Sequence, residues 1–141
     1  MSLRLPLYAS LLLLSLPAFA ATQKVDLDYR VRFLPESNQA EVSITLEKGE
    51  YVRSLDFNLG EDGRFSDFKA DGQWSQEVAG RGKWQPGEGK SVLNYRVLID
   101  SERKPGRYDA RMTDDWALFR GDDLIPAAKL DQQTKIELVA R

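Results

Sequence analysis

The stretch Val25-Asp26-Leu27-Asp28-Tyr29-Arg30-Val31-Arg32-Phe33 decides the fold class, because apolar or aromatic residues alternate with charged ones throughout it. An unbroken period of two is typical of a β-strand with one face buried and the other in water. The charged face carries two acids and then two bases, which predicts cross-strand ion pairs on a solvated sheet face. The stretch therefore predicts a half-buried antiparallel strand.

The same alternation returns along the rest of the chain. Turn-forming residues at 35–38 separate the first strand from a second at 40–46, so we expect these two to form a hairpin. The glycine-rich stretch 72–90 is expected to hold up to two short strands. Other short strands are expected near residues 55–59, 65–68, 92–99, 108–112 and 134–139. We therefore predict an all-β fold, a single antiparallel β-sandwich-like domain of about seven to nine strands.

Residues 1–20 are expected to be a cleavable signal peptide. A single base, Arg4, precedes an apolar run from Leu7 to Leu16, and small residues end the segment. The run is about half as long as the roughly 20 apolar residues that a bilayer core requires. We therefore predict a periplasmic or secreted domain at residues 21–141, with no membrane association after cleavage.

The composition excludes several classes of chemistry, because the chain has no histidine and no cysteine. Without histidine there is no Ser-His-Asp triad and no His-ligated zinc. Without cysteine there is no disulfide, no thiolate nucleophile and no lipid-anchored cysteine. The 20 basic and 22 acidic residues are interleaved, so we expect no nucleic-acid partner.

Three acidic pairs are considered as carboxylate candidates: Asp26 with Asp28, Asp114 with Asp115, and Asp122 with Asp123. Their spacing matches no calcium loop, and chain spacing alone cannot place two carboxyl groups across a glycosidase cleft. We expect Asp26 and Asp28 to lie on the solvated strand face and the other two pairs to lie in loops or turns, with Asp115 or Asp123 capping backbone donors. No catalytic, cofactor-binding or metal-binding residue is predicted.

Aromatic residues near loops supply the remaining candidates for ligand contact. Trp84, Tyr108 and Trp116 lie in or beside expected loops. Exposed rings of this kind hold sugars or peptides in many β domains, because a flat ring offers contact area at low entropic cost. The alternative is that the rings fill the ends of the core.

Several short segments resemble parts of one known family. They are Tyr29-Arg30-Val31, Gly63-Arg64-Phe65, the Tyr95-containing strand at 92–97, and Ala117-Leu118-Phe119-Arg120-Gly121 with Pro126 beyond it. In this order they resemble the N-terminal β domain of the glycyl-aminopeptidase-type zinc metallopeptidases that also carry a PDZ module. The resemblance covers residues 25–126, and it implies a β fold, export and a relationship to the accessory domain of a peptidase, but no peptidase activity.

The catalytic domain of that family holds zinc in a His-Glu-x-x-His helix, which is missing from this sequence. No active-site residue of the family carries over, so we expect no enzymatic activity. The expected function is that of an exported non-catalytic domain with a structural role or a protein or peptide partner. The alternatives are a carbohydrate-binding sandwich that uses Trp84 or Trp116 and, last in order, a small carboxylate-based hydrolase. The oligomeric state is left open.

Overall fold

The chain is almost entirely β in the computed structural model, which describes residues 22–60, 63–78, 80–132 and 136–140. The predicted signal peptide lies outside the described residues. These contain twelve strands, two 3₁₀ turns, η1 (Pro35–Ser37) and η2 (Gly49–Tyr51), and one short helix, α1 (Gly121–Leu124). This confirms the all-β prediction. There are more strands than expected, because several are too short to show an alternation of their own.

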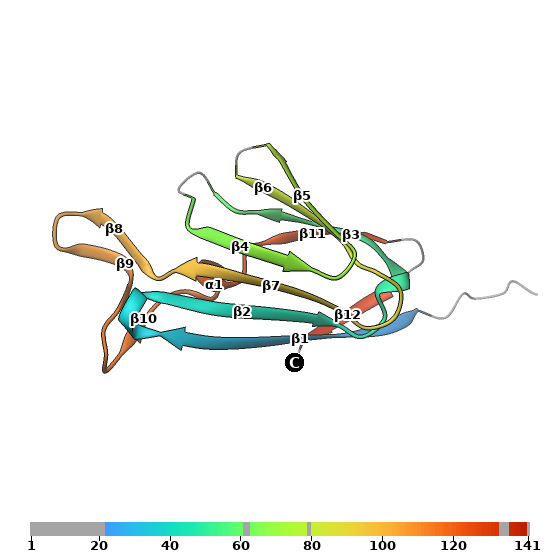
Figure 1. Ribbon diagram of the computed structural model, residues 1–141, viewed down its shortest axis with the longest axis horizontal. Helices are drawn as coiled ribbons and strands as arrows, with labels where there is room; N and C mark the ends of the chain where they lie inside the picture. Colours follow the sequence, from blue (N-terminus) through green and yellow to red (C-terminus); the bar gives the residue numbers. More distant parts are fainter. Residues whose placement is uncertain (1–21, 61–62, 79, 133–135, 141) are drawn as a thin grey trace, which may run out of the picture.

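The largest sheet has five strands and includes the predicted hairpin. Its spatial order is β12 (Ile136–Ala140), β1 (Gln23–Leu34), β2 (Gln39–Leu46), β7 (Ser91–Leu98) and β4 (Phe65–Ala70) (Figure 1). β1 and β2 are antiparallel and are joined through η1, where Asn38 adopts a left-handed conformation with φ of 52°. Asparagine tolerates that conformation better than most residues, which explains its place in the turn.

One pair in this sheet differs from the expectation of a wholly antiparallel domain. β12 lies parallel to β1, with Val25 opposite Leu138, whereas the other neighbours in the sheet are antiparallel. A hairpin fixes strands as antiparallel, but these two strands are separated by most of the chain. The alternation of residues 134–139 therefore could not reveal the direction in which the strand pairs.

Two smaller sheets complete the fold. A four-stranded sheet has the order β11 (Ala128–Gln132), β3 (Val52–Asn58), β6 (Arg81–Gln85) and β5 (Gln73–Val78). A three-stranded sheet has the order β10 (Ala117–Leu118), β9 (Arg107–Met112) and β8 (Asp100–Lys104). β5 and β6 are the two short strands expected within 72–90, and all pairs in both sheets are antiparallel.

The apolar faces of the two larger sheets contribute to one hydrophobic core. Val42 and Leu93 reach the core from the first sheet, and Phe57 and Trp84 reach it from the second. Each fully buried Val, Leu or Phe side chain contributes about 1.5–3 kcal/mol relative to exposure. The period-two alternation thus stabilises the fold directly, by delivering one apolar face per strand.

Helix α1 is attached to this core through a buried tyrosine. The Tyr95 hydroxyl on β7 donates a hydrogen bond of 2.7 Å to the Leu124 carbonyl, and both residues are buried. Burial raises the pKa of Tyr95 well above its usual range, so the phenol remains a proton donor. The contact fixes α1 against the end of the five-stranded sheet.

Candidate binding site

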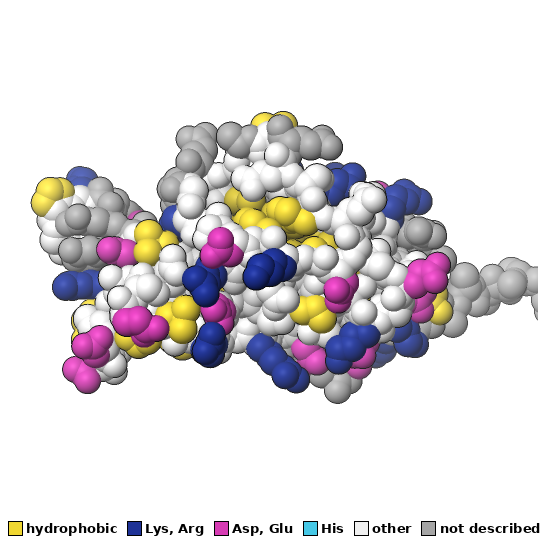
Figure 2. Space-filling model, viewed as in Figure 1, with side chains coloured by type: hydrophobic (Ala, Val, Ile, Leu, Met, Phe, Trp, Pro, Cys, Tyr) yellow, Lys and Arg dark blue, Asp and Glu magenta, His cyan; other side chains and the backbone are white. Residues whose placement is uncertain are grey.

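The outward face of the five-stranded sheet carries an open hollow of about 810 Å³. The alternation that turns Val31 and Val42 toward the core sends their neighbours Arg32 and Glu41 outward. Figure 2 shows this face, with basic and acidic side chains gathered over β1, β2, β7 and β4. Four cations and two carboxylates line the hollow. It is therefore locally basic, although the whole chain has a net charge of −2.

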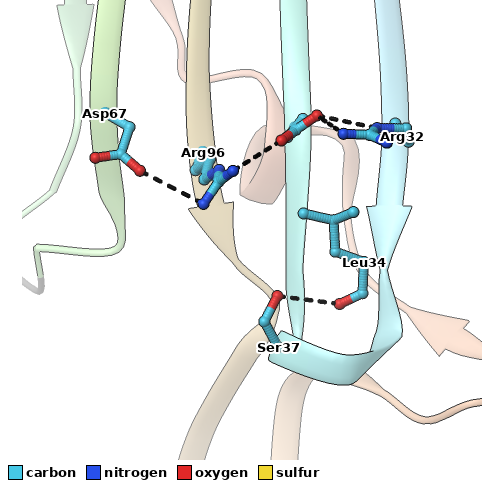
Figure 3. A network of polar contacts seen from close by, with 6 residues as sticks. Arg32, Leu34, Ser37, Asp67 and Arg96 are labelled. Atoms are coloured by element: carbon cyan, nitrogen blue, oxygen red, sulfur yellow. Dashed lines mark hydrogen bonds and ion pairs between the residues drawn. The ribbon is translucent and has the colours of Figure 1, made fainter.

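One row of charges crosses the sheet and includes the labelled Arg32, Arg96 and Asp67 (Figure 3). Glu41 on β2 stands between Arg32 on β1 and Arg96 on β7 in the strand register. The Arg32 Nε lies 2.9 Å from Glu41 Oε2, and the Arg96 Nη2 lies 3.0 Å from Oε1. Arg96 also faces Asp67 of β4, at 3.8 Å. The row confirms the cross-strand ion pairs expected from the charged face of residues 25–33.

Glu41 is held in its ionised form by these partners. Hydrogen bonds from Arg32 and then from Arg96 lower the pKa of the Glu41 carboxyl below its ordinary value. The group is therefore a carboxylate at neutral pH, with both oxygens engaged. A carboxylate in this state orients cations and is not suited to donate a proton.

A second row of polar side chains lies beside the first. In the register, Arg30 of β1 stands opposite Ser43 of β2, Ser43 opposite Asn94 of β7, and Asn94 opposite Lys69 of β4. All four residues line the hollow. Arg30 and Lys69 are exposed, and neither makes an ion pair with any described residue. The hollow thus has a neutral polar centre with an available cation on each side.

A β-bulge in β4 shapes the edge of the hollow. The pairing of β4 with β7 shifts between Ser66 and Lys69, and Asp67 within the bulge has a φ of 55°. This geometry brings the Asp67 carboxylate to Arg96, whereas the next ring, Phe68, stacks on Trp74 with centroids 4.1 Å apart. Because of the bulge, Asp67 lies on the charged face while the adjacent Phe68 packs against a core aromatic ring.

The three predicted ligand-contact residues do not come together in one site. Trp84 is 0% exposed, and its indole Nε1 donates to the Asp71 carbonyl at 2.8 Å, so it is a core residue. Its place on β6 corrects the expectation of a loop position, and its burial confirms the alternative that this ring fills the core. Trp116 is 51% exposed in the turn before β10, away from the hollow lining. Tyr108 lies on β9, and its side chain is not among those described.

Asp114 and Asp115 lie in a bend and Asp122 and Asp123 lie in α1, whereas Asp26 and Asp28 lie on strand β1. Asp123 accepts a 2.7 Å hydrogen bond from the Arg120 backbone N–H at the start of α1 and lies 3.4 Å from the Arg64 guanidinium. This confirms the expected cap. Asp122 pairs with the Arg120 side chain at 3.0 Å. Within the described residues, no group of three or more acidic, histidine or cysteine side chains has metal-binding geometry.

The residues of the hollow were not singled out by the sequence. Arg30 and Arg32 were visible as the charged face of a strand, but their partners on β2, β7 and β4 come from other parts of the chain. The register that aligns them depends on the β1–β2 turn and on the β4 bulge. Only the alternation of residues 40–46 and 92–99 could have indicated that Glu41, Ser43, Asn94 and Arg96 share one face.

Comparison with protein-family models finds no match to the chain, and comparison with curated proteins finds none either. The resemblance to the metallopeptidase N-terminal domain therefore stays a prediction. Within the described part of the chain, no helix combines the length and apolar character needed to cross a bilayer.

Proposed function

We propose that the two packed sheets are a β-sandwich, exported from the cell, that serves as a non-catalytic binding domain for a protein or peptide. The observation that carries this proposal is the open polar hollow on the outward face of the five-stranded sheet. Its charges sit on paired strands, and cross-strand ion pairs hold several of them in place. A preorganised charged surface favours recognition, because little side-chain entropy is lost when a partner binds.

The titratable groups of the hollow favour a binding role over acid–base catalysis. Glu41 is ionised and shared by two arginines, and Asp67 faces Arg96. General acid catalysis requires a carboxyl whose pKa is raised toward neutrality, whereas the pKa of Glu41 is lowered. These carboxylates therefore suit a role in orienting arginines toward a partner.

The resemblance to the accessory domain of a zinc metallopeptidase is part of the same proposal. The segment at 117–121 that carries it forms β10 and the start of α1, at one end of the fold. A surface that binds polypeptide would suit a domain that accompanies a peptidase, because the substrates of a peptidase are polypeptides. In this proposal the domain binds the polypeptide and takes no part in cleaving its bonds.

A single-site photocrosslinker tests the proposal directly. Because the chain has no cysteine, Ser43→Cys would carry one diazirine-maleimide probe at the centre of the hollow. Lys83→Cys, at an exposed position of β6 on the other sheet, is the matched control. In extract of the producing organism, we expect the Ser43 probe to capture discrete polypeptides that the Lys83 probe does not. No polypeptide at the Ser43 probe, or the same set at both, would refute the binding role.

A carbohydrate-binding role is the second candidate, and it rests on the exposure of Trp116. Leu118 nearby is 58% exposed, so the turn and β10 present apolar surface. A sugar stacked on Trp116 would quench its fluorescence, and Trp116→Phe would abolish that change. Oligosaccharides that leave the tryptophan fluorescence unaltered would dismiss this role.

A further inference from the structure

We propose that the hollow binds an extended acidic peptide segment, whose carboxylates four residues apart pair with Arg30 on β1 and Lys69 on β4. This inference rests on the proposed function and names the chemical class of its ligand. The peptide crosses the strands along the row that contains Ser43 and Asn94, in contact with all four strands that line the hollow.

The spacing of the two cations sets the spacing of the acids. Arg30 and Lys69 stand at the ends of one cross-strand row and are separated by three strand-to-strand steps. Each step is about 4.8 Å, so their backbones lie about 14 Å apart. An extended peptide rises about 3.4 Å per residue and alternates its side chains, so residues i and i+4 share a face at about 14 Å. A single phosphate or sulfate is too small to reach both cations.

The two cations are available because the neighbouring acids are already engaged. Glu41 is bound by Arg32 and Arg96, and Arg96 also reaches Asp67. Arg30 and Lys69 make no ion pair with a described residue and remain exposed. Pairing with an incoming carboxylate therefore requires no existing ion pair to break.

The centre of the row suits the backbone of a peptide. The Ser43 hydroxyl and the Asn94 amide can each donate and accept a hydrogen bond. Neither side chain makes a hydrogen bond to another described residue, and both line the hollow. Between two acidic side chains, an extended peptide presents N–H and C=O groups that these side chains can satisfy.

The carboxylates of the hollow disfavour the binding of dense polyanions. Glu41 remains ionised beside the row, and Asp67 lies at its edge, so a sulfated glycan or nucleic acid would meet two like charges. Stacking sites for sugar rings are also lacking at the residues that line the hollow. The Tyr95 ring is 2% exposed, and the Phe68 ring stacks on Trp74.

Synthetic peptides test the inference by fluorescence anisotropy against the purified protein. Three labelled Ser/Thr-rich peptides carry two Glu at i and i+4, two Glu at i and i+1, or two Gln at i and i+4. We expect the first to bind tightest and to weaken as NaCl is raised, because exposed ion pairs are screened. Arg30→Gln and Lys69→Gln should each weaken its binding two- to fivefold, which is about what an exposed ion pair contributes. Lys83→Gln, on the other sheet, should change nothing.

The outcomes separate this inference from the proposed function. Equal affinity for the two Glu peptides, or equal losses in Lys83→Gln, would overturn the acidic-peptide inference. So would tighter binding of heparin or of phosphatidylglycerol vesicles that depends on Arg30 and Lys69. If the Ser43 probe captures polypeptides but no acidic peptide binds, the binding role stands and this ligand class is wrong. If the probe captures none, the binding role itself fails. Circular dichroism of each variant checks that it is folded.

Discussion

Replacing Trp84 with phenylalanine tests whether this tryptophan stabilises the core or binds a ligand. Trp84 is fully buried on β6, opposite Leu55 of β3 and Trp74 of β5, and its Nε1–H is bonded to the Asp71 carbonyl at 2.8 Å. Phenylalanine keeps an aromatic ring at the site but removes the N–H donor and part of the ring volume. The substitution should therefore lower the free energy of unfolding and leave partner binding unchanged.

The expected magnitude follows from two losses. Losing the part-buried hydrogen bond to the carbonyl of the exposed Asp71 costs about 0.5–1.5 kcal/mol, because water can replace the donor. The smaller ring leaves roughly 40 Å³ unfilled, which at about 24 cal/mol per Å³ adds about 1 kcal/mol. Together Trp84→Phe should lower the free energy of unfolding by about 1.5–2.5 kcal/mol, a substantial share of the 5–15 kcal/mol typical of a domain.

Urea unfolding followed by far-ultraviolet circular dichroism measures this loss, because fluorescence would change with the substitution itself. Trp116→Phe is the matched control, since that ring is 51% exposed. We expect the control to change the free energy of unfolding by no more than about 0.5 kcal/mol. A small effect at Trp84 together with a large one at Trp116 would refute the assignment of Trp84 to the core.

Three further predictions follow from named contacts. Tyr95→Phe removes the buried hydrogen bond to α1 and should lower the free energy of unfolding by about 1–2 kcal/mol in urea; no loss would mean that the bond is not formed. Because the pKa of Glu41 is lowered in the fold, its ion pairs stabilise the protein above the ordinary pKa and are lost as pH falls through the lowered value. Arg96→Gln should raise the pKa of Glu41 toward the ordinary value in an NMR titration, and an unchanged pKa would contradict the row. In Gly82→Ala, the new Cβ would lie 2.3 Å from the Trp74 ring, so the free energy of unfolding should fall by about 1–3 kcal/mol, and unaltered stability would show that the ring moves freely.

The elements predicted well are those in which local pattern and tertiary burial agree. The alternations of residues 25–33 and 40–46 and the turn between them predict β1, η1 and β2 almost to the residue. A buried strand face must be apolar at every second position, so the pattern is visible without any knowledge of partners. The sequence predicts a cap at Asp115 or Asp123 for the same kind of reason, because a turn acid satisfies donors only a few residues away, and the structure shows one at Asp123.

The features that were missed depend on contacts between distant parts of the chain. Trp84 reads as a loop residue because glycines and a proline surround it, yet the β5–β6 hairpin buries it completely. The hollow requires Arg30 and Lys69 to share one row, which depends on three strand registers and on the bulge in β4. Composition predicts a near-neutral surface, and only the register shows that one face is locally basic.

The parallel pairing of β12 with β1 has a mechanical consequence. Gln23 stands opposite Ile136 and Leu27 opposite Ala140, so the first and last described strands run side by side in the same direction. A force that pulls residue 22 and residue 140 apart acts along both strands and loads their ladder in shear. The backbone hydrogen bonds must then yield together, whereas a hairpin pulled at its open end opens one bond at a time. Tension applied at residues 22 and 140 would therefore have to break the β1–β12 ladder as a unit.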